Sequence, residues 1–215
     1  MSLTLAQLIC FKTGGVLSRM TERRFTLVLL VIVATLAVFM AEGEAKVYLN
    51  HKQALKRAFP EAGTVITKEY LRITPDLAKR IREKGGVKTT SFSSKTIYIG
   101  KIKNNIVGYA IIDNVKGKSR PITYMVVIEP DGKIKQVDVL AYRESHGSEI
   151  RYPSFLKQFI GKRVSDRIRH RRDIKNISGA TLSCRAITDG TRTLLILWEE
   201  IYGSKKNIEN ESDKR

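Results

Sequence analysis

The feature that most constrains this chain is an uncharged apolar run near its N-terminus, from Phe25 to Ala41. A helix rises about 1.5 Å per residue, so a run of this length just crosses the hydrocarbon core of a bilayer. The run is apolar on every helical face, which argues against a helix buried inside a folded domain. We therefore expect a transmembrane anchor or signal-anchor at residues 25–41.

Basic side chains before this run predict its orientation. They are Lys12, Arg19, Arg23 and Arg24. By the positive-inside rule, residues 1–24 form a cytoplasmic segment, and the chain after Glu42 lies on the extracytoplasmic (periplasmic) side. A cleaved signal peptide is the alternative, but Phe39-Met40-Ala41 is a poor small-x-small cleavage site, which favours a retained anchor. A start at Met20 would leave a compact basic segment, MTERRF, before the same run.

The composition restricts the partners and the chemistry. There are 39 Lys and Arg residues against 21 Asp and Glu, an excess typical of chains that meet nucleic acid or anionic membranes. The basic residues are spread along the chain and no nucleic-acid-binding signature accompanies them, so we expect a membrane partner and no nucleic acid. The two cysteines, Cys10 and Cys184, exclude an intrachain disulfide framework, a CxxC pair and a Cys-rich metal site.

Two short helices are expected in residues 42–95, the helical N-terminal part of the exported region. Apolar spacing predicts one helix over His51 to Phe59, which Pro60 stops. Thr74-Pro75-Asp76 opens the second, which closes at Gly85-Gly86.

Beyond this part the apolar period changes to that of strands. Four β-branched-rich runs of strand length are Thr96–Ile99, Ile106–Ile112, Ile122–Ile128 and Ile134–Ala141. Asn104-Asn105 and Pro130-Asp131-Gly132 have turn chemistry and separate neighbouring runs, so the strands are expected to form antiparallel hairpins.

The C-terminal third is predicted to be mostly helical. Tyr152 to Ile160 is expected to form a short amphipathic helix, and Val164 to Arg172 a basic segment facing solvent or lipid. Apolar residues at three- and four-residue steps predict a helix from Ser183 to Tyr202 that packs on the sheet, followed by a polar tail at 204–215. The expected fold class is α+β: an antiparallel sheet flanked by helices and preceded by one N-terminal transmembrane helix.

A turn of small residues feeds the last helix, and it carries the clearest chemistry. Gly179 allows unusual backbone angles and close approach of a ligand, while the free N–H groups and the dipole of a helix N-terminus favour an anion such as phosphate. Ser178, Thr181 and Ser183 supply hydroxyl groups. Ordinary helix capping by serine or threonine explains the same residues and is the commoner arrangement.

Ser178-Gly179-Ala180-Thr181 resembles the flavin-attachment motif of the FMN-binding domain family. That family includes components of the sodium-translocating NADH:quinone reductase and of the Rnf electron-transport complex. In it, a dedicated flavin transferase esterifies the motif's threonine to the FMN phosphate outside the cytoplasm. The resemblance therefore implies FMN held covalently on Thr181, with Leu182 next to the attachment point.

A second match strengthens the first. Glu144-Ser145-His146-Gly147 follows a strand and resembles the family's Glu-Thr-Pro-Gly loop, which lies against the flavin. The resemblance extends from about Ile97 to Tyr202, so residues 96–203 are expected to be the FMN-binding domain. His146 stands where many members have proline. Such a loop histidine is usually just solvated, but beside a flavin it would donate a hydrogen bond or a proton to the ring.

One departure from the family concerns the residues before the motif. Members usually carry an aspartate shortly before the motif serine, whereas this chain has Asn176 in that region and its nearest upstream aspartate is Asp173.

The resemblance implies an electron-carrying flavoprotein. Its expected partners are the membrane, the flavin transferase, and membrane redox proteins or a quinone-linked electron donor. No catalytic triad, HExxH motif, Walker A loop or GxGxxG turn is present. Two alternatives stay open: a flavin-dependent reductase of a small substrate, and a module that binds a ligand or partner without flavin.

Overall fold

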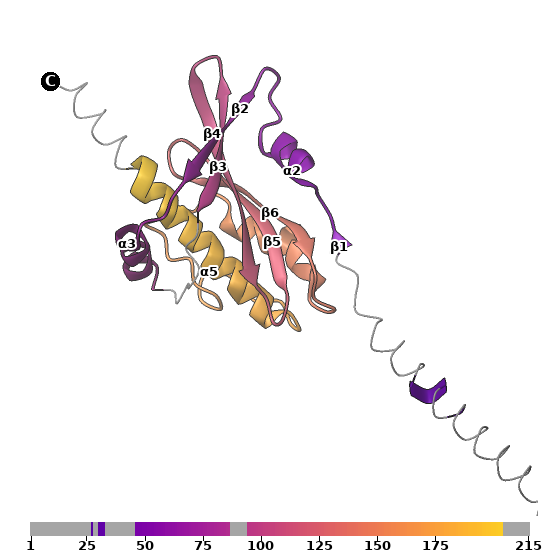
Figure 1. Ribbon diagram of the computed structural model, residues 1–215. Coiled ribbons are helices and arrows are strands. Elements are labelled where there is room, and N and C mark those ends of the chain that lie inside the picture. The colour runs from indigo at the N-terminus through magenta and orange to yellow at the C-terminus, as the bar shows by residue number, and fades with distance from the viewer. Residues whose placement is uncertain (1–26, 28–29, 33–45, 87–93, 204–215) are drawn as a thin grey trace, which may run out of the picture. The chain divides into compact units, whose positions relative to one another are not determined.

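An antiparallel sheet organises the part of the chain that the computed structural model describes, residues 27, 30–32, 46–86 and 94–203 (Figure 1). Within this part the sheet has six strands in the order β1-β6-β5-β4-β3-β2. They are β1 (Lys46–Val47), β2 (Val65–Leu71), β3 (Lys95–Ile102), β4 (Asn105–Lys116), β5 (Pro121–Ile128) and β6 (Ile134–Tyr142). The predicted α+β class with an antiparallel sheet is confirmed.

The predicted membrane segment falls almost wholly outside the described residues, as do residues 1–24 and 204–215. Of residues 25–41, Leu27 and 30–32 are described; they are helical, with exposed side chains. Among the described residues there is no helix with both the length and the apolar character needed to cross a bilayer. The described residues from 46 onward belong to one compact unit.

The four predicted strands are present as β3 to β6, and each extends at least one residue beyond its predicted bounds. The β3–β4 turn passes through Lys103 at φ 54°, and the β5–β6 turn through Gly132 at φ 89°. The two edge strands β1 and β2 lie in the region that was expected to be helical, and the sequence analysis missed both. Lys68 and Glu69 interrupt the apolar pattern of β2, which is largely exposed and is defined by its pairing with β3.

The two helices predicted before the sheet are confirmed as α2 (His51–Ala58) and α3 (Pro75–Gly85). Each begins where a side chain satisfies the free N–H groups of its first turn. The Asn50 Oδ1 atom accepts a hydrogen bond from the Gln53 backbone N–H at 2.8 Å, and Gln53 Oε1 accepts one from the Asn50 N–H at 3.0 Å. Thr74 Oγ1 caps α3 by accepting from the Leu77 N–H at 3.3 Å.

The segment after β6 corrects the prediction of a single helix over Tyr152 to Ile160. It consists of a 3₁₀ turn (Ser148–Arg151), the one-turn helix α4 (Pro153–Leu156) and a second 3₁₀ turn (Lys157–Phe159). The tight final turn leads the chain into Gly161, at φ 79°. There the Gly161 N–H donates to the Ile134 carbonyl at 2.8 Å, and the Ile134 N–H donates to the Lys162 carbonyl at 2.9 Å. This pairing with β6 ends the helical path.

The sheet separates two apolar layers. Figure 1 shows α5 (Thr181–Trp198) running along one face with α3 beside it, and α2 on the opposite side. Alternate residues of β5 face the two layers, as the strand period requires: Tyr124, Val126 and Ile128 pack in the α5 layer, and Met125 and Val127 in the α2 layer. The last helix thus packs on the sheet as predicted, but it begins two residues earlier, at Thr181, and ends in a π-helical turn at Glu199–Gly203.

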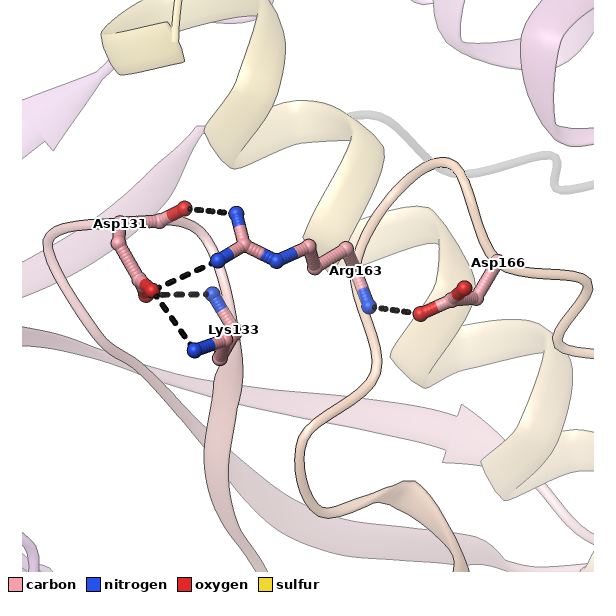
Figure 2. Close-up of polar contacts among 4 residues, drawn as sticks. All are labelled: Asp131, Lys133, Arg163 and Asp166. Carbon is pink, nitrogen blue, oxygen red and sulfur yellow. Dashed lines mark hydrogen bonds and ion pairs between the residues drawn. The ribbon is translucent and has the colours of Figure 1, made fainter.

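The connection from the 3₁₀ turns to α5 is fixed to the β5–β6 hairpin by Arg163 (Figure 2). The Arg163 guanidinium donates to the Asp131 carbonyl oxygen at 2.7 Å and to Asp131 Oδ2 at 2.8 Å. The Arg163 backbone N–H donates to Asp166 Oδ2 at 2.7 Å. After Arg163, the predicted basic segment Val164 to Arg172 exposes most of its side chains, while Ile168 is buried.

The close approach of α5 to the sheet depends on Gly190. A Cβ atom at Gly190 would lie 2.5 Å from Tyr124 Oη and 2.6 Å from Val115 Cγ1. We expect Gly190→Ala to lower the free energy of unfolding by about 1–3 kcal/mol, because overpacking outweighs the roughly 1 kcal/mol that alanine adds to helix propensity. Urea unfolding measures this. Arg185→Ala on the exposed side of the same helix is the control, with an expected change within about 0.5 kcal/mol; equal effects of the two substitutions would contradict the packing argument.

Candidate functional site

The two motifs found in the sequence meet at the N-terminal end of α5. Gly147 closes the Glu144–Gly147 loop at φ 87°, a backbone angle that favours glycine. A Cβ atom there would lie 3.0 Å from the Ala180 Cβ and 2.9 Å from Tyr142 Oη. The loop after β6 therefore packs directly against the Ser178–Thr181 turn.

Tyr142, the last residue of β6, joins this loop to α5. Its hydroxyl donates to the His146 carbonyl oxygen at 2.5 Å and lies 3.0 Å from Ser183 Oγ in the first turn of α5. Burial raises the pKa of Tyr142, with the Ser183 hydrogen bond acting the other way, so the hydroxyl stays protonated and available as a donor. Nothing in the sequence pattern distinguishes this tyrosine from an ordinary core residue.

Glu144 fixes the β4–β5 connection against the same loop. Its Oε1 atom accepts the backbone N–H groups of Ser119 at 2.7 Å and Arg120 at 2.9 Å. Burial alone would raise the pKa of Glu144, but the backbone N–H donors and the charge of Lys118 outweigh it and hold that pKa below its usual range. Gly117 leaves room for the carboxylate, since a Cβ there would lie 2.7 Å from Oε1.

A hollow of about 500 Å³ opens between these loops and α5, within the range typical of ligand pockets. Its lining residues are Lys118, Tyr142, Glu144, Ser145, His146, Gly179, Ala180, Thr181, Leu182 and Ser183. Of the residues singled out in the sequence, Gly147 and Ser178 do not line the hollow; Gly147 packs against Tyr142 and Ala180. Lys118 and Tyr142 are lining residues that the sequence did not reveal.

The start of α5 shows whether a serine or threonine side chain caps this helix. The N-cap is Ala180, and no side chain in the described part of the chain makes a capping hydrogen bond there. Ser178 precedes this position and Thr181 follows it, so ordinary capping by serine or threonine, the commoner arrangement for such a turn, is not what the chain adopts. Among the described residues, no side chain therefore accepts from the N–H groups of the first turn, and such a helix N-terminus favours an anion. Gly179 has φ 78°, as its place in the turn predicts.

Thr181 has one further neighbour from the preceding loop, Asn176, and Asn176 is in turn contacted by His170. The Asn176 Nδ2 atom donates to Thr181 Oγ1 at 3.1 Å, and His170 Nε2 lies 2.9 Å from Asn176 Oδ1. Sequence reasoning identified Asn176 only as a departure from the family and did not identify His170. No linear pattern could have paired them, because their contact depends on how the loop folds back.

Comparison with known proteins finds a protein family that matches the part of the chain containing the hollow. Residues 117–196 match the FMN-binding domain, and this stretch contains both motif loops. The match confirms, over these residues, the resemblance to the FMN-binding domain family inferred from the sequence.

The fold is shared with a solved structure. NqrC of Shewanella oneidensis is 14% identical, with 73% of this chain and 89% of that chain covered and a TM-score of 0.50. A second structure, of a Na(+)-translocating NADH-quinone reductase component from Parabacteroides distasonis, is 14% identical, with 61% and 75% covered and a TM-score of 0.43. At 14% identity, the likeness to NqrC concerns the fold alone. A search of curated protein sequences finds no match.

The residues of the hollow fit FMN. An anionic phosphate suits the uncapped first turn of α5, where Thr181 is partly exposed. A Cβ placed on Gly179 meets no described atom within 4 Å, so the turn is open to a ligand. Lys118 adds a cation to the rim, and Leu182, 52% exposed, adds an apolar surface.

The anchoring role of Glu144 predicts a pH-dependent loss of stability. We expect Glu144→Ala to lower the free energy of unfolding by about 1–2 kcal/mol at pH 7, because two backbone donors lose their charged acceptor. The pKa of Glu144 is lower in the folded than in the unfolded protein. Its contribution is therefore complete above the unfolded carboxyl pKa and is lost as the pH falls through the folded value.

Urea unfolding of wild type and variant at pH 7 and below pH 4 measures the difference. Glu149→Ala, an exposed acidic residue beyond the same loop, serves as the control. A stability gap between wild type and Glu144→Ala that stays constant across this pH range would contradict the assigned role.

Proposed function

We propose that the protein carries FMN covalently, through a phosphoester to Thr181 Oγ1, and transfers electrons on the extracytoplasmic side of a membrane. The observation that carries the proposal is the position of Thr181. It is the first residue of a helix with no side-chain cap, and it lines a hollow that the Glu144–His146 loop also borders. A threonine hydroxyl, free helix N–H groups and space for a large ligand coincide there.

The start of α5 would hold the phosphate. The backbone N–H groups of its first turn and the helix dipole stabilise negative charge at this end. Ala180 and Gly179 keep the approach free of bulky side chains. Thr181 is only partly buried, so its hydroxyl is within reach of a flavin transferase that acts on the folded protein.

The rim of the hollow would orient the ring system. Bound FMN supplies reversible two-electron redox chemistry. The exposed side chains of Ser145 and His146 lie at the rim, with His146 Nδ1 3.0 Å from Ser145 Oγ. Lys118 offers positive charge that favours the reduced, more negative form of the cofactor.

The N-terminal sequence supports the proposed extracytoplasmic location. The uncharged run 25–41 and the basic residues before it support a single anchor with residues 42–215 outside the cytoplasm. A domain anchored there has its redox partners in or beside the membrane. With the resemblance carried by the two motif loops, this supports membrane redox proteins or a quinone-linked donor as partners, together with the flavin transferase that loads Thr181.

A second function is favoured by the exposed rim. Ser145 and His146 are both solvent-exposed beside the hollow, which leaves a side from which a small substrate would reach the cofactor. A reductase of this kind would sustain steady turnover with a soluble electron donor and one small acceptor. A carrier would exchange electrons only with its protein or quinone partners.

Covalent attachment is tested by fluorescence in a denaturing gel. The full-length protein is exported together with an active flavin transferase, and we expect a fluorescent band that Thr181→Ala abolishes, because no other residue supplies the ester oxygen. Thr67→Ala, at an exposed threonine on β2, is the matched control and should keep full fluorescence. A dark wild-type band, with the transferase active on another substrate, rules out the covalent carrier.

The charge of Lys118 should be visible in the redox potential. Replacing Lys118 by Gln is expected to lower the midpoint potential of the bound flavin by about 20 mV, equivalent to about 1 kcal/mol for a two-electron couple. Spectroelectrochemical titration measures the shift. Lys116→Gln, at a neighbouring exposed lysine outside the hollow, should leave the potential near the wild-type value. Equal shifts in the two variants would show that only the general surface charge matters.

A further inference from the structure

Thr181 Oγ1 ends a line of polar groups that begins at His170. The His170 Nε2 atom lies 2.9 Å from Asn176 Oδ1, and the Asn176 Nδ2 atom donates to Thr181 Oγ1 at 3.1 Å. All three side chains are partly buried. Neither His170 nor Asn176 is among the residues that line the hollow, whereas Thr181 is.

The loop that carries His170 is built to return toward α5. A bridge joins His170 to Ile174, and Arg171 adopts φ 62°, a left-handed turn. The Arg171 N–H donates to the Ile174 carbonyl at 2.9 Å, and the Arg169 N–H donates to Asp173 Oδ2 at 3.2 Å. These bonds hold the imidazole against Asn176 independently of any ligand.

The chemistry of the amide determines which group donates in each of these two hydrogen bonds. An amide has one acceptor oxygen and one donor nitrogen, so with Nδ2 on Thr181 its Oδ1 accepts from His170 Nε2–H. Thr181 Oγ1 thus accepts a hydrogen bond from the Asn176 amide. Its own hydroxyl proton and remaining lone pair are directed away from Asn176.

We infer that Asn176 and His170 are positioning residues for the attachment of FMN to Thr181, an inference that rests on the proposed function. Attachment requires an activated flavin dinucleotide as donor. The Thr181 Oγ1–phosphorus bond forms while the pyrophosphate P–O bond breaks; a nucleoside monophosphate leaves, and the hydroxyl proton passes to a base of the transferase. The Asn176 N–H holds Oγ1 in one rotamer and stabilises the negative charge that develops on it. His170 holds the amide in the orientation that presents this N–H.

The roles of the two residues predict different substitution patterns. Asn176→Leu keeps the approximate size and removes the donor, and we expect the kcat of attachment to fall about tenfold. His170→Phe keeps a ring without an N–H, with an expected fall of about threefold or more. His170→Gln places an amide N–H near the position of Nε2 and should stay within about twofold of wild type. In every case the KM of the transferase for this protein stays nearly unchanged.

The experiment follows flavin incorporation into the full-length apoprotein in detergent, with purified transferase and FAD, by fluorescence in denaturing gels. His51→Phe is the matched control, a histidine on the first turn of α2 at the opposite face of the sheet, and should leave the rate unchanged. Urea unfolding of each variant verifies folding. If Asn176→Leu does not unfold cooperatively, the His170→Phe and His170→Gln pair decides the question.

The outcomes separate this inference from the proposed function. Slow attachment in His170→Phe that is restored in His170→Gln, at constant KM, supports the line of polar groups. Wild-type rates in Asn176→Leu and His170→Phe overturn it and leave the covalent flavin intact, as does a change confined to KM. Equal slowing in His170→Phe and His170→Gln also overturns it. A wild-type protein that an active transferase does not label removes the proposed function and this inference together.

Discussion

The packing of α5 on the sheet determines where every part of the site lies. The helix approaches β5 closely at Gly190, opposite Tyr124, and this contact fixes its position along the strands. One end of α5 is thereby set beside the last residue of β6, where the Tyr142 hydroxyl links the helix to the following loop. The two motif loops lie far apart in the sequence and share a site only because the sheet and α5 are in register.

Much of this architecture could be predicted from local patterns. The capping residues Asn50 and Thr74 mark the starts of α2 and α3, and β-branched runs between turn-forming residues indicate β3 to β6. These signals are local because each depends on a few neighbouring residues. The edge strand β2 was missed because its partly charged residues become a strand only through pairing with β3.

The candidate site was predictable in its motifs but not in its supporting contacts. Gly179 and Thr181 carried recognisable chemistry because the motif is contiguous. His170 and Lys118 carried none, since each lies on a loop whose path the sequence does not encode in any periodic form; Lys118 lines the hollow and His170 contacts Asn176. Glu144 was expected to border the flavin. It does line the hollow, and its carboxylate also accepts the backbone N–H groups of Ser119 and Arg120, which holds the loop that presents Lys118.

The contact between Gly147 and Ala180 bears on whether the protein folds before or after a cofactor is attached. Thr181 and the Glu144–Gly147 loop come together only after β6 and α5 have docked, so an unfolded chain has the Ser178–Thr181 sequence without the hollow around it. Under the proposed attachment of FMN to Thr181, the transferase would modify only molecules that have already folded. Misfolded copies would then lack the flavin and its yellow colour.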